Sequence, residues 1–336
     1  MRALVWHGPR SMTAEQVPQP QPAVGEVLLR PLAVGICGSE LSGYLGESSL
    51  RQPPLIMGHE FCATVETAPP GSGLSPGQRV VVNPLLTCGE CAMCRRGREN
   101  LCVRRRIIGA ACPGAFADLV AVPRAACLPA PEGLPPAIAA MAEPLACAVR
   151  AVEQAQIGVT DGVLIIGAGA IGLLTLAVAR RAGAGLLAVA DPNTARLETA
   201  RAWGATHLLD AHGDLVARMR SLTADLGVDV AIDAVGLTAT RRAAVRAARP
   251  GGRVVLIGLH EADSTLPINE IVRGETQVTG CFCYRQHTFE RALRLLQEGL
   301  LAPGAWQEER PLEAGPETFE ELLGGGVAAS KIVLKV

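Results

Sequence analysis

Apolar residues follow two different patterns along the chain, and the change between them falls at about residue 145. Before that point, short β-type runs such as EVLLRPLAVGI (26–36) and RVVVNP (79–84) are separated by turn sequences rich in proline and glycine. Such runs are typical of a mostly β region with irregular loops. Residues 131–156 then shift to helix-forming composition.

From about residue 160 the pattern alternates between short buried strands and helices. The expected strands are VLIIG (163–167), LLAVAD (186–191), VDVAIDAVG (228–236) and RVVLIGL (253–259), and the expected helices are 172–183, 194–205 and 238–252. Strands that alternate with helices of this length predict βαβ units and a doubly wound parallel sheet.

The tail of the chain returns to a different pattern. An amphipathic helix is expected at 288–299, and SKIVLKV at 330–336 reads as a strand. The two ends of the chain are therefore expected to form one domain around the βαβ insert. We place this domain at 1–147 and 284–336, and the inserted domain at 148–283.

Composition supports a globular, two-domain protein. The chain has 336 residues, of which 49% are hydrophobic and 19% charged; as a prior, a domain takes roughly 150 residues. The net charge of −1 argues against a general nucleic-acid or membrane-surface binder. The first residues, MRALVWHGPR, lack the apolar core of a signal peptide, and no run is long enough to span a bilayer. A cytoplasmic location is expected.

A glycine-rich turn follows the first strand of the alternating region. VLIIGAGAIG places Gly167, Gly169 and Gly172 in G-x-G-x-x-G order, directly before a predicted helix. The first glycine permits a tight turn, the second lets backbone approach a pyrophosphate, and the third allows close packing of helix on strand. The intervening Ala170 and Ile171 are expected to lie at the same dinucleotide site, at a helix N-terminus that favours phosphate.

An acidic residue ends the next predicted strand. Asp191 follows Gly167 by the interval typical of a ribose-binding carboxylate. A carboxylate there accepts hydrogen bonds from the adenosine ribose and repels a 2′-phosphate, which predicts NAD over NADP. Arg196, in the helix that follows, is also expected to contact the cofactor.

Four of the eleven cysteines are clustered in CGECAMCRRGRENLC, with the spacing C-x2-C-x2-C-x7-C. Four thiolates this close can converge on one tetrahedral ion and leave no open position for a substrate. We expect a structural zinc in a lobe at 84–106; an iron–sulfur cluster is the other chemical possibility. A zinc ribbon that binds nucleic acid is disfavoured, because no aromatic residues interleave the nearby arginines. The expected ligands are Cys88, Cys91, Cys94 and Cys102.

Further candidate ligands are scattered. GICGSELSGY carries Cys37, MGHEF carries His59 and Glu60, and AEPLA carries Glu143. A thiolate, an imidazole and a carboxylate make a plausible three-ligand zinc site with an open fourth position. No local spacing links these residues, so each is ambiguous when taken singly.

These motifs, together with the four-cysteine lobe, GAGAIG, DAVG and SKIVLKV, give the chain a resemblance to the zinc-dependent medium-chain dehydrogenases. Within that family it resembles the sorbitol, polyol and threonine dehydrogenase branch, over essentially the whole length. The resemblance implies a GroES-like catalytic domain with an inserted Rossmann domain. It also implies Cys37, His59 and Glu143 as ligands of a catalytic zinc, since the polyol branch places a glutamate where classical alcohol dehydrogenases have a cysteine.

The resemblance assigns roles to four other residues. Glu60 corresponds to the family's mobile glutamate near the metal, and Glu40 stands where the family usually has an aspartate that orients the zinc-bound histidine. Ser39 matches the hydroxyl that takes the alcohol proton. Ser42 occupies the position at which many relatives have a proton-relay histidine; a serine has no pKa near neutrality, so the proton must leave by another route.

The interpretation is therefore a zinc- and NAD-dependent oxidoreductase, with two zinc ions per chain, that interconverts a secondary alcohol and its ketone. Sugar alcohols, cyclitols, vicinal diols and amino-alcohols remain open as substrates. The alternatives are a zinc-free reductase, which would lack both ligand sets, and a cofactor-binding protein without activity. A homodimer or homotetramer is implied by the family, and neither a nucleic acid nor a membrane is expected as a partner.

Overall fold

The computed structural model describes residues 1–336, and the chain divides into two compact units. Unit 1 comprises Met1–Glu143 and Arg285–Val336, and unit 2 comprises Pro144–Tyr284. The expected junctions lay at 147/148 and 283/284. The expected classes, a mostly β domain and a doubly wound parallel sheet, are confirmed.

Unit 1 is built around a sheet in which both ends of the chain take part. Its strand order is β10-β6-β5-β3-β18-β17, with β9 also paired to β3, and the strands β2-β1-β4 form a smaller sheet. The strands are β1 (Arg2–Gly8), β2 (Ser11–Gln16), β3 (Glu26–Gly35), β4 (Leu55–Ile56), β5 (Glu60–Thr67), β6 (Arg79–Val82), β7 (Leu85–Leu86), β8 (Arg106–Ile107), β9 (Val120–Pro123), β10 (Cys127–Pro129), β17 (Gln307–Pro311) and β18 (Lys331–Lys335).

Few helices accompany these strands. Helix α10 shows the expected amphipathic period, since Phe289, Ala292 and Leu296 on one face are buried. The helices of unit 1 are α1 (Gly38–Tyr44), α2 (Ala92–Arg95), α3 (Pro136–Ala139), α10 (Gln286–Gln297) and α11 (Gly315–Leu323); α4 (Ala142–Ala155) passes from this unit into the next.

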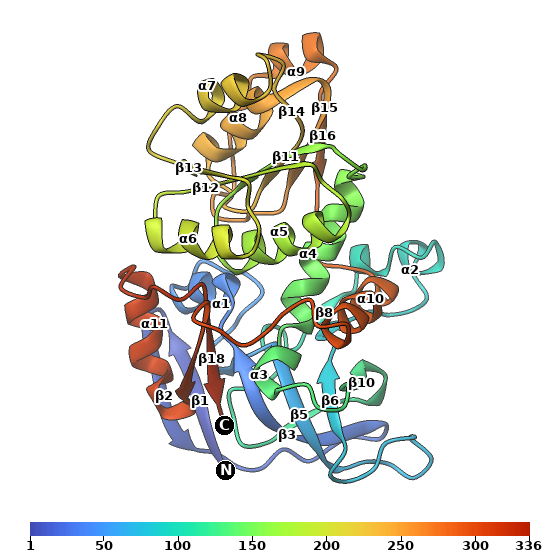
Figure 1. The fold of residues 1–336 in the computed structure, drawn as a ribbon. Helices are drawn as coiled ribbons and strands as arrows, with labels where there is room; N and C mark the ends of the chain where they lie inside the picture. The colour runs from blue at the N-terminus through green and yellow to red at the C-terminus, as the bar shows by residue number, and fades with distance from the viewer. The chain divides into compact units, whose positions relative to one another are not determined.

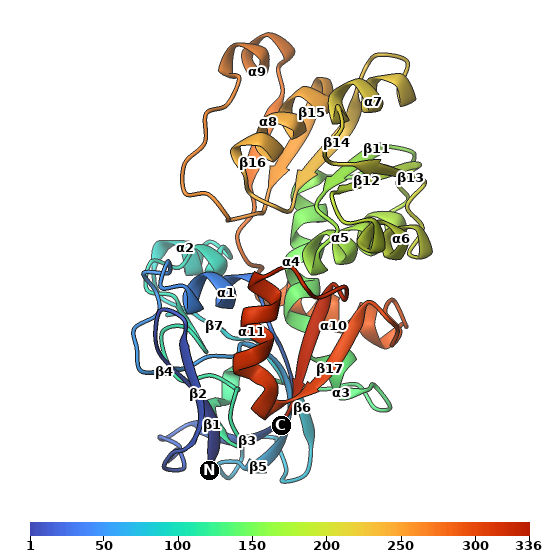
Figure 2. The ribbon, with the colours of Figure 1, turned by 90° about the vertical axis from the view of Figure 1, so that its left-hand side faces the viewer.

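The C-terminal segment completes the core of unit 1. Strand β18 lies between β3 and β17, and the N and C labels lie near each other in both ribbon views (Figures 1 and 2). Phe319 of α11 packs its ring against Tyr44, with ring centroids 5.2 Å apart. This apolar packing explains how the two segments of unit 1, which unit 2 separates in the sequence, form one domain.

Unit 2 is a six-stranded parallel sheet of order β13-β12-β11-β14-β15-β16. In Figure 1, α5 and α6 cover one face of this sheet, and α7 and α8 cover the other. The strand order reverses between β11 and β14, the place where such sheets bind ligands at their carboxyl ends. The elements are β11 (Gly162–Ile166), α5 (Ala170–Arg181), β12 (Leu186–Asp191), α6 (Thr194–Ala202), β13 (His207–Asp210), α7 (Leu215–Leu222), β14 (Val228–Asp233), α8 (Thr238–Ala247), β15 (Ala248–Leu256), α9 (Ile268–Gly274) and β16 (Gln277–Gly280).

None of the helices has the length and apolar character needed to cross a bilayer.

Candidate active site

Three potential metal ligands meet at one edge of the unit 1 sheet. The ligand atoms of Cys37, His59 and Glu60 lie within 4.8 Å of one another. Strands β3 and β5 are antiparallel neighbours with Gly35 opposite Glu60, so the end of β3 and the start of β5 coincide. This register brings Cys37, just beyond β3, beside His59, just before β5.

Glu40 holds the imidazole of His59 in place. The Nδ1 atom of His59 lies 2.8 Å from Oε1 of Glu40, which leaves Nε2 for a metal. The Glu40 carboxylate also accepts hydrogen bonds from the backbone N–H groups of Gly58 (2.8 Å) and Cys37 (2.9 Å). Although burial raises the pKa of Glu40, His59 lowers it below its ordinary value, and the side chain remains a carboxylate. The longer side chain of Glu40 therefore still reaches the histidine.

The chemistry of these donors suits zinc. Zinc binds thiolate, imidazole and carboxylate groups, and a catalytic site uses three protein ligands with one position open. Burial lowers the pKa of His59, but the Glu40 carboxylate and Cys37 raise it well above its ordinary value. A bound zinc would supply Lewis-acid polarisation of the substrate oxygen.

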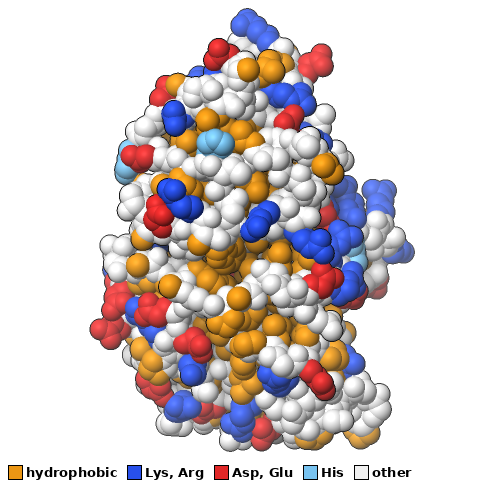
Figure 3. All heavy atoms as spheres, in the orientation of Figure 1, with side chains coloured by type: hydrophobic (Ala, Val, Ile, Leu, Met, Phe, Trp, Pro, Cys, Tyr) orange, Lys and Arg blue, Asp and Glu red, His pale blue; other side chains and the backbone are white.

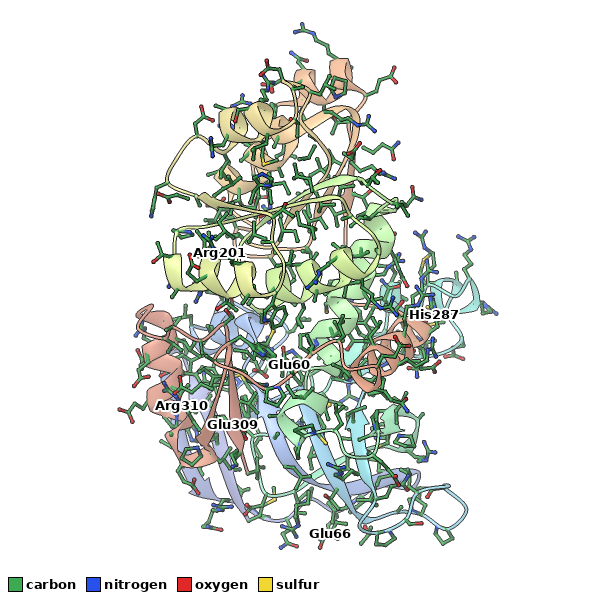
Figure 4. The ribbon with its side chains drawn as sticks, viewed as in Figure 1. Glu60, Glu66, Arg201, His287, Glu309 and Arg310 are labelled. Atoms are coloured by element: carbon green, nitrogen blue, oxygen red, sulfur yellow. The ribbon has the colours of Figure 1, made fainter.

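Lys331 is a member of this site that the sequence interpretation missed. Its ammonium forms an ion pair with the Glu60 carboxylate and donates a hydrogen bond of 2.8 Å to the carbonyl oxygen of Ile36. Both charged side chains are buried, and Figure 4 shows Glu60 inside unit 1, whereas Glu66, near the far end of the same strand, lies at its edge. The only signal in the sequence is a lysine directly before the apolar residues of SKIVLKV.

Strand order explains how Lys331 reaches the site. β18 is the other neighbour of β3, with Val333 opposite Gly35. A Cβ at Gly35 would lie 2.8 Å from Cε of Lys331, so glycine at the end of β3 leaves the room that the buried pair occupies. Burial lowers the pKa of Lys331, but Glu60 raises it above its ordinary value, and the lysine stays charged.

The expected ligand Glu143 is not one of the three converging residues. It is buried in the first turn of α4, at the last position of unit 1. The structure therefore brings together Cys37, His59 and the neighbouring Glu60, and the assignment of Glu143 as the third ligand stays a prediction.

Two serines and a tyrosine lie near Cys37 on α1. The exposed Ser39 donates a hydrogen bond of 3.4 Å to Sγ of Cys37, whereas Ser42 is half-buried farther along the helix. The Tyr44 hydroxyl donates to Glu320 at 2.8 Å and its ring is buried in the core. Tyr44 is therefore a core residue.

The clustered cysteines form a second site. Sγ of Cys91 is 3.5 Å from Sγ of Cys94, and Sγ of Cys102 is 3.4 Å from Sγ of Cys88. All four thiols lie within 4.8 Å of one another, and none of the eleven cysteines forms a disulfide. Backbone N–H groups of Glu90 and Cys91 lower the pKa of the Cys88 thiol to about 6, whereas burial and the neighbouring thiols Cys91 and Cys102 raise the pKa of Cys94 to about 12. Four sulfur donors in this arrangement fit a structural zinc.

Basic side chains surround this lobe. Figure 3 shows them gathered over α2, where Arg95, Arg96 and Arg98 are exposed. Arg104 forms an ion pair with Glu90 within the lobe. Part of the local positive charge is thus balanced by an acidic neighbour.

The glycine turn of unit 2 has the geometry of a dinucleotide site. Gly167 adopts φ +99°, a conformation that favours glycine, directly after β11. A Cβ at Gly172 would collide with the carbonyl oxygen of Gly167, whereas nothing lies within 4 Å of one at Gly169. The third glycine thus permits close packing, and the second leaves space for a phosphate. Ala170 and Ile171 begin α5, whose free N–H groups face this turn.

Asp191 lies beside the glycine turn because β12 is the parallel neighbour of β11. Its carboxylate accepts hydrogen bonds from the backbone N–H groups of Ala168 (2.7 Å) and Asn193 (2.8 Å). Arg196, in the first turn of α6, is half-buried, and its Nε has no hydrogen-bond partner. An acidic and a basic group therefore both lie at the end of β12.

Comparison with known proteins identifies the family. The chain matches the families described as zinc-binding dehydrogenase (residues 170–298) and alcohol dehydrogenase GroES-like domain (residues 23–132). Sorbitol dehydrogenase of Bacillus subtilis is 33% identical over 90% of this chain and 87% of its own. L-threonine 3-dehydrogenase of Pyrococcus horikoshii is 33% identical over 95% of this chain and 94% of its own.

Solved structures agree with this result. A zinc-binding dehydrogenase from Sinorhizobium meliloti, bound to NADP, has a TM-score of 0.93 at 30% identity and covers 100% of this chain and 99% of its own. The chain belongs to the zinc-dependent medium-chain dehydrogenases, in the polyol dehydrogenase-like branch. It is an oxidoreductase that interconverts an alcohol and its ketone, with zinc and a nicotinamide cofactor. The zinc-free and non-catalytic alternatives are not favoured.

Proposed function

We propose that the protein oxidises a secondary alcohol of the polyol, cyclitol or diol type with NAD, using one catalytic and one structural zinc per chain. The observation that carries the proposal is the convergence of Cys37, His59 and Glu60, with His59 oriented by Glu40. Glu143 is the proposed third ligand. Glu60, which is paired with Lys331, is the proposed mobile glutamate near the metal. Ser39, beside the Cys37 thiol, receives the proton of the alcohol.

A screen of NAD reduction with the zinc-loaded protein tests this function. The panel holds sugar alcohols, cyclitols, vicinal diols, L-threonine and matched primary alcohols, each assayed with NAD and with NADP. We expect turnover with at least one secondary alcohol and none with matched primary alcohols. Reduction of neither cofactor by any member of the panel contradicts the proposal.

Cofactor preference is assigned to Asp191. Its buried carboxylate, beside the glycine turn, is the group that we assign to the adenosine ribose and that would repel a 2′-phosphate, although a related structure holds NADP and Arg196 offers a positive charge nearby. Asp191→Gly is expected to lower the ratio of kcat/KM for NAD to that for NADP by about 10-fold or more, which corresponds to about 1.4 kcal/mol or more, because the carboxylate that repels a 2′-phosphate is removed.

The matched control for that change is Asp210→Gly. Asp210 also ends a parallel strand of the sheet, and its carboxylate accepts from the backbone N–H of His212 at 2.9 Å. The Asp210→Gly variant should leave the ratio of kcat/KM for NAD to that for NADP unchanged. Wild-type protein that uses NADP better than NAD, or an Asp191→Gly variant with the wild-type ratio, contradicts the assignment.

The structural zinc gives a second, independent prediction. Cys88→Ser should bind one zinc ion fewer per chain and lower the Tm by roughly 5–10 °C, since a domain of this size loses about 2–4 °C per kcal/mol. Cys112→Ser, at a half-buried cysteine outside both ligand groups, is the control. Metal analysis and calorimetry measure the effect; an unchanged zinc content would contradict the assignment of Cys88 as a zinc ligand.

The cytoplasmic location and the homodimeric or homotetrameric state stay predictions.

A further inference from the structure

A buried arginine without an ionic partner lies beside the proposed active site. Arg51 is only 5% exposed, and it forms no ion pair with any carboxylate. Its Nε is buried without a hydrogen-bond partner. The two other nitrogens make long contacts of 3.4 Å, Nη2 with Oγ of Ser39 and Nη1 with Oγ of Ser48. A buried guanidinium is costly when it is so poorly paired.

The nearby carboxylates are already engaged. Glu40 is close enough for Arg51 to lower its pKa, but its oxygens accept from His59, Gly58 and the Cys37 backbone. Glu60 is paired with Lys331. The carboxylate oxygens near Arg51 are therefore taken by other donors, and its guanidinium keeps N–H groups without a close acceptor.

The fold also holds the Arg51 side chain in place. Its stem crosses α1 at Gly43, where a Cβ would lie 2.9 Å from Nε and collide with Cδ. Glycine inside a helix costs about 0.5–1 kcal/mol relative to alanine, so this glycine is unfavourable for the helix itself. It leaves a slot that fits the arginine, and the slot directs the guanidinium toward Ser39.

Ser39 links this cation to the reacting position. Its side chain is exposed, and Oγ contacts Cys37 Sγ on one side and Arg51 Nη2 on the other, at 3.4 Å in each case. If a hydroxyl group of the substrate contacts Ser39, another group of the same substrate, a few bonds away, would thus lie within reach of the Arg51 guanidinium. Arginine binds carboxylates and phosphates through paired charge-assisted hydrogen bonds.

We propose that Arg51 is an anion-binding subsite of the substrate pocket, and that the preferred alcohol carries a carboxylate or phosphate group. This inference rests on the proposed function of the same site and narrows its substrate class. Arg51 is a substrate-binding residue, since the anion it binds stays unchanged while the alcohol carbon is oxidised.

The test compares three alcohols of the same configuration: a hexitol, its phosphate ester and the corresponding hexonate. The kcat/KM for NAD reduction by the wild type should be higher for at least one anion than for the hexitol. Arg51→Gln should reduce this preference by about 10- to 100-fold, the value of a charge-assisted hydrogen-bonded contact, mainly through KM. Arg51→Lys should restore part of it. Arg30→Gln, at an exposed arginine paired with Glu66, should leave it unchanged.

Calorimetric titration of the zinc-loaded protein with the hexonate and the hexitol phosphate, without NAD, supplies a readout independent of turnover. Weaker binding of an anion to Arg51→Gln, at wild-type zinc content, supports the subsite even if none of the three alcohols is oxidised. Absence of turnover with all secondary alcohols contradicts the proposed function instead. Equal kcat/KM for the three compounds, or an unchanged preference in Arg51→Gln, overturns the subsite. The anion that binds more tightly, carboxylate or phosphate, identifies the group that the subsite recognises.

Discussion

Cys37→Ser is expected to lose one zinc ion per chain and to lower kcat/KM by about 10³-fold or more. The thiol of Cys37 is one of three ligand atoms that lie within 4.8 Å of one another, and serine is a much weaker zinc ligand at neutral pH. Lewis-acid polarisation supplies several kcal/mol of transition-state stabilisation, and each 1.4 kcal/mol corresponds to about a factor of ten in rate. Metal analysis and steady-state kinetics measure the two losses.

The specificity of that result depends on two other cysteine variants. Cys112→Ser should keep both zinc ions and full turnover, because Cys112 belongs to neither ligand group. Cys88→Ser should lose a zinc ion and thermal stability, since its thiol lies in the four-cysteine lobe. A Cys37→Ser variant that retains its zinc and its turnover would remove this residue from the catalytic site.

Lys331→Met is expected to lower the free energy of unfolding by about 3–5 kcal/mol, the cost of leaving one member of a buried ion pair uncompensated. Glu60 is 1% exposed and Lys331 is 4% exposed, so solvent cannot replace the lost ammonium. The ammonium also bonds the carbonyl oxygen of Ile36, and its loss leaves that acceptor without this donor. Denaturant-induced unfolding of the zinc-loaded protein measures the change.

The chain provides a matched control, because Lys331 and Lys335 are its only lysines. Lys335 lies on the same strand, but its side chain is 64% exposed and its ion pair with Glu309 is long, at 3.8 Å. Lys335→Met should therefore lower the free energy of unfolding by about 0–1 kcal/mol. The double variant Lys331→Met/Glu60→Gln should recover most of the loss, since no unpaired charge remains. Equal effects of the two lysine variants, or no recovery in the double variant, would show that the buried pair is not what stabilises this edge of the sheet.

Patterns of apolar and polar residues within single helices and strands were sufficient to predict the architecture. The alternation of strand and helix from about residue 160 matches the parallel sheet β11 to β16, because periodic burial acts within each element. The helices and strands with weak signals escaped prediction: α7, α9 and the edge strands β13 and β16 are short, and few of their residues are buried. Short edge elements depend on neighbouring strands rather than on their own composition.

The candidate sites divide in the same way. The four-cysteine lobe could be predicted as a cluster, since its ligands fall within a few turns of chain and close on one another locally. Cys37 and His59 needed a family resemblance, because only the register of β3 against β5 brings them together. Glu60 converges with them in the structure, whereas the family pattern pointed to Glu143 as the third ligand.

By itself the sequence determined the two classes of domain, the glycine turn at Gly167 and the cysteine lobe, because each follows from spacing over a few residues. Only the tertiary structure decided which distant side chains share one edge of the sheet. Lys331 reaches the carbonyl oxygen of Ile36 across 295 positions of sequence, and Arg51 reaches Ser39 through the space left by Gly43. Such contacts depend on strand order, register and side-chain volume, and a linear pattern of apolar and polar residues carries none of these.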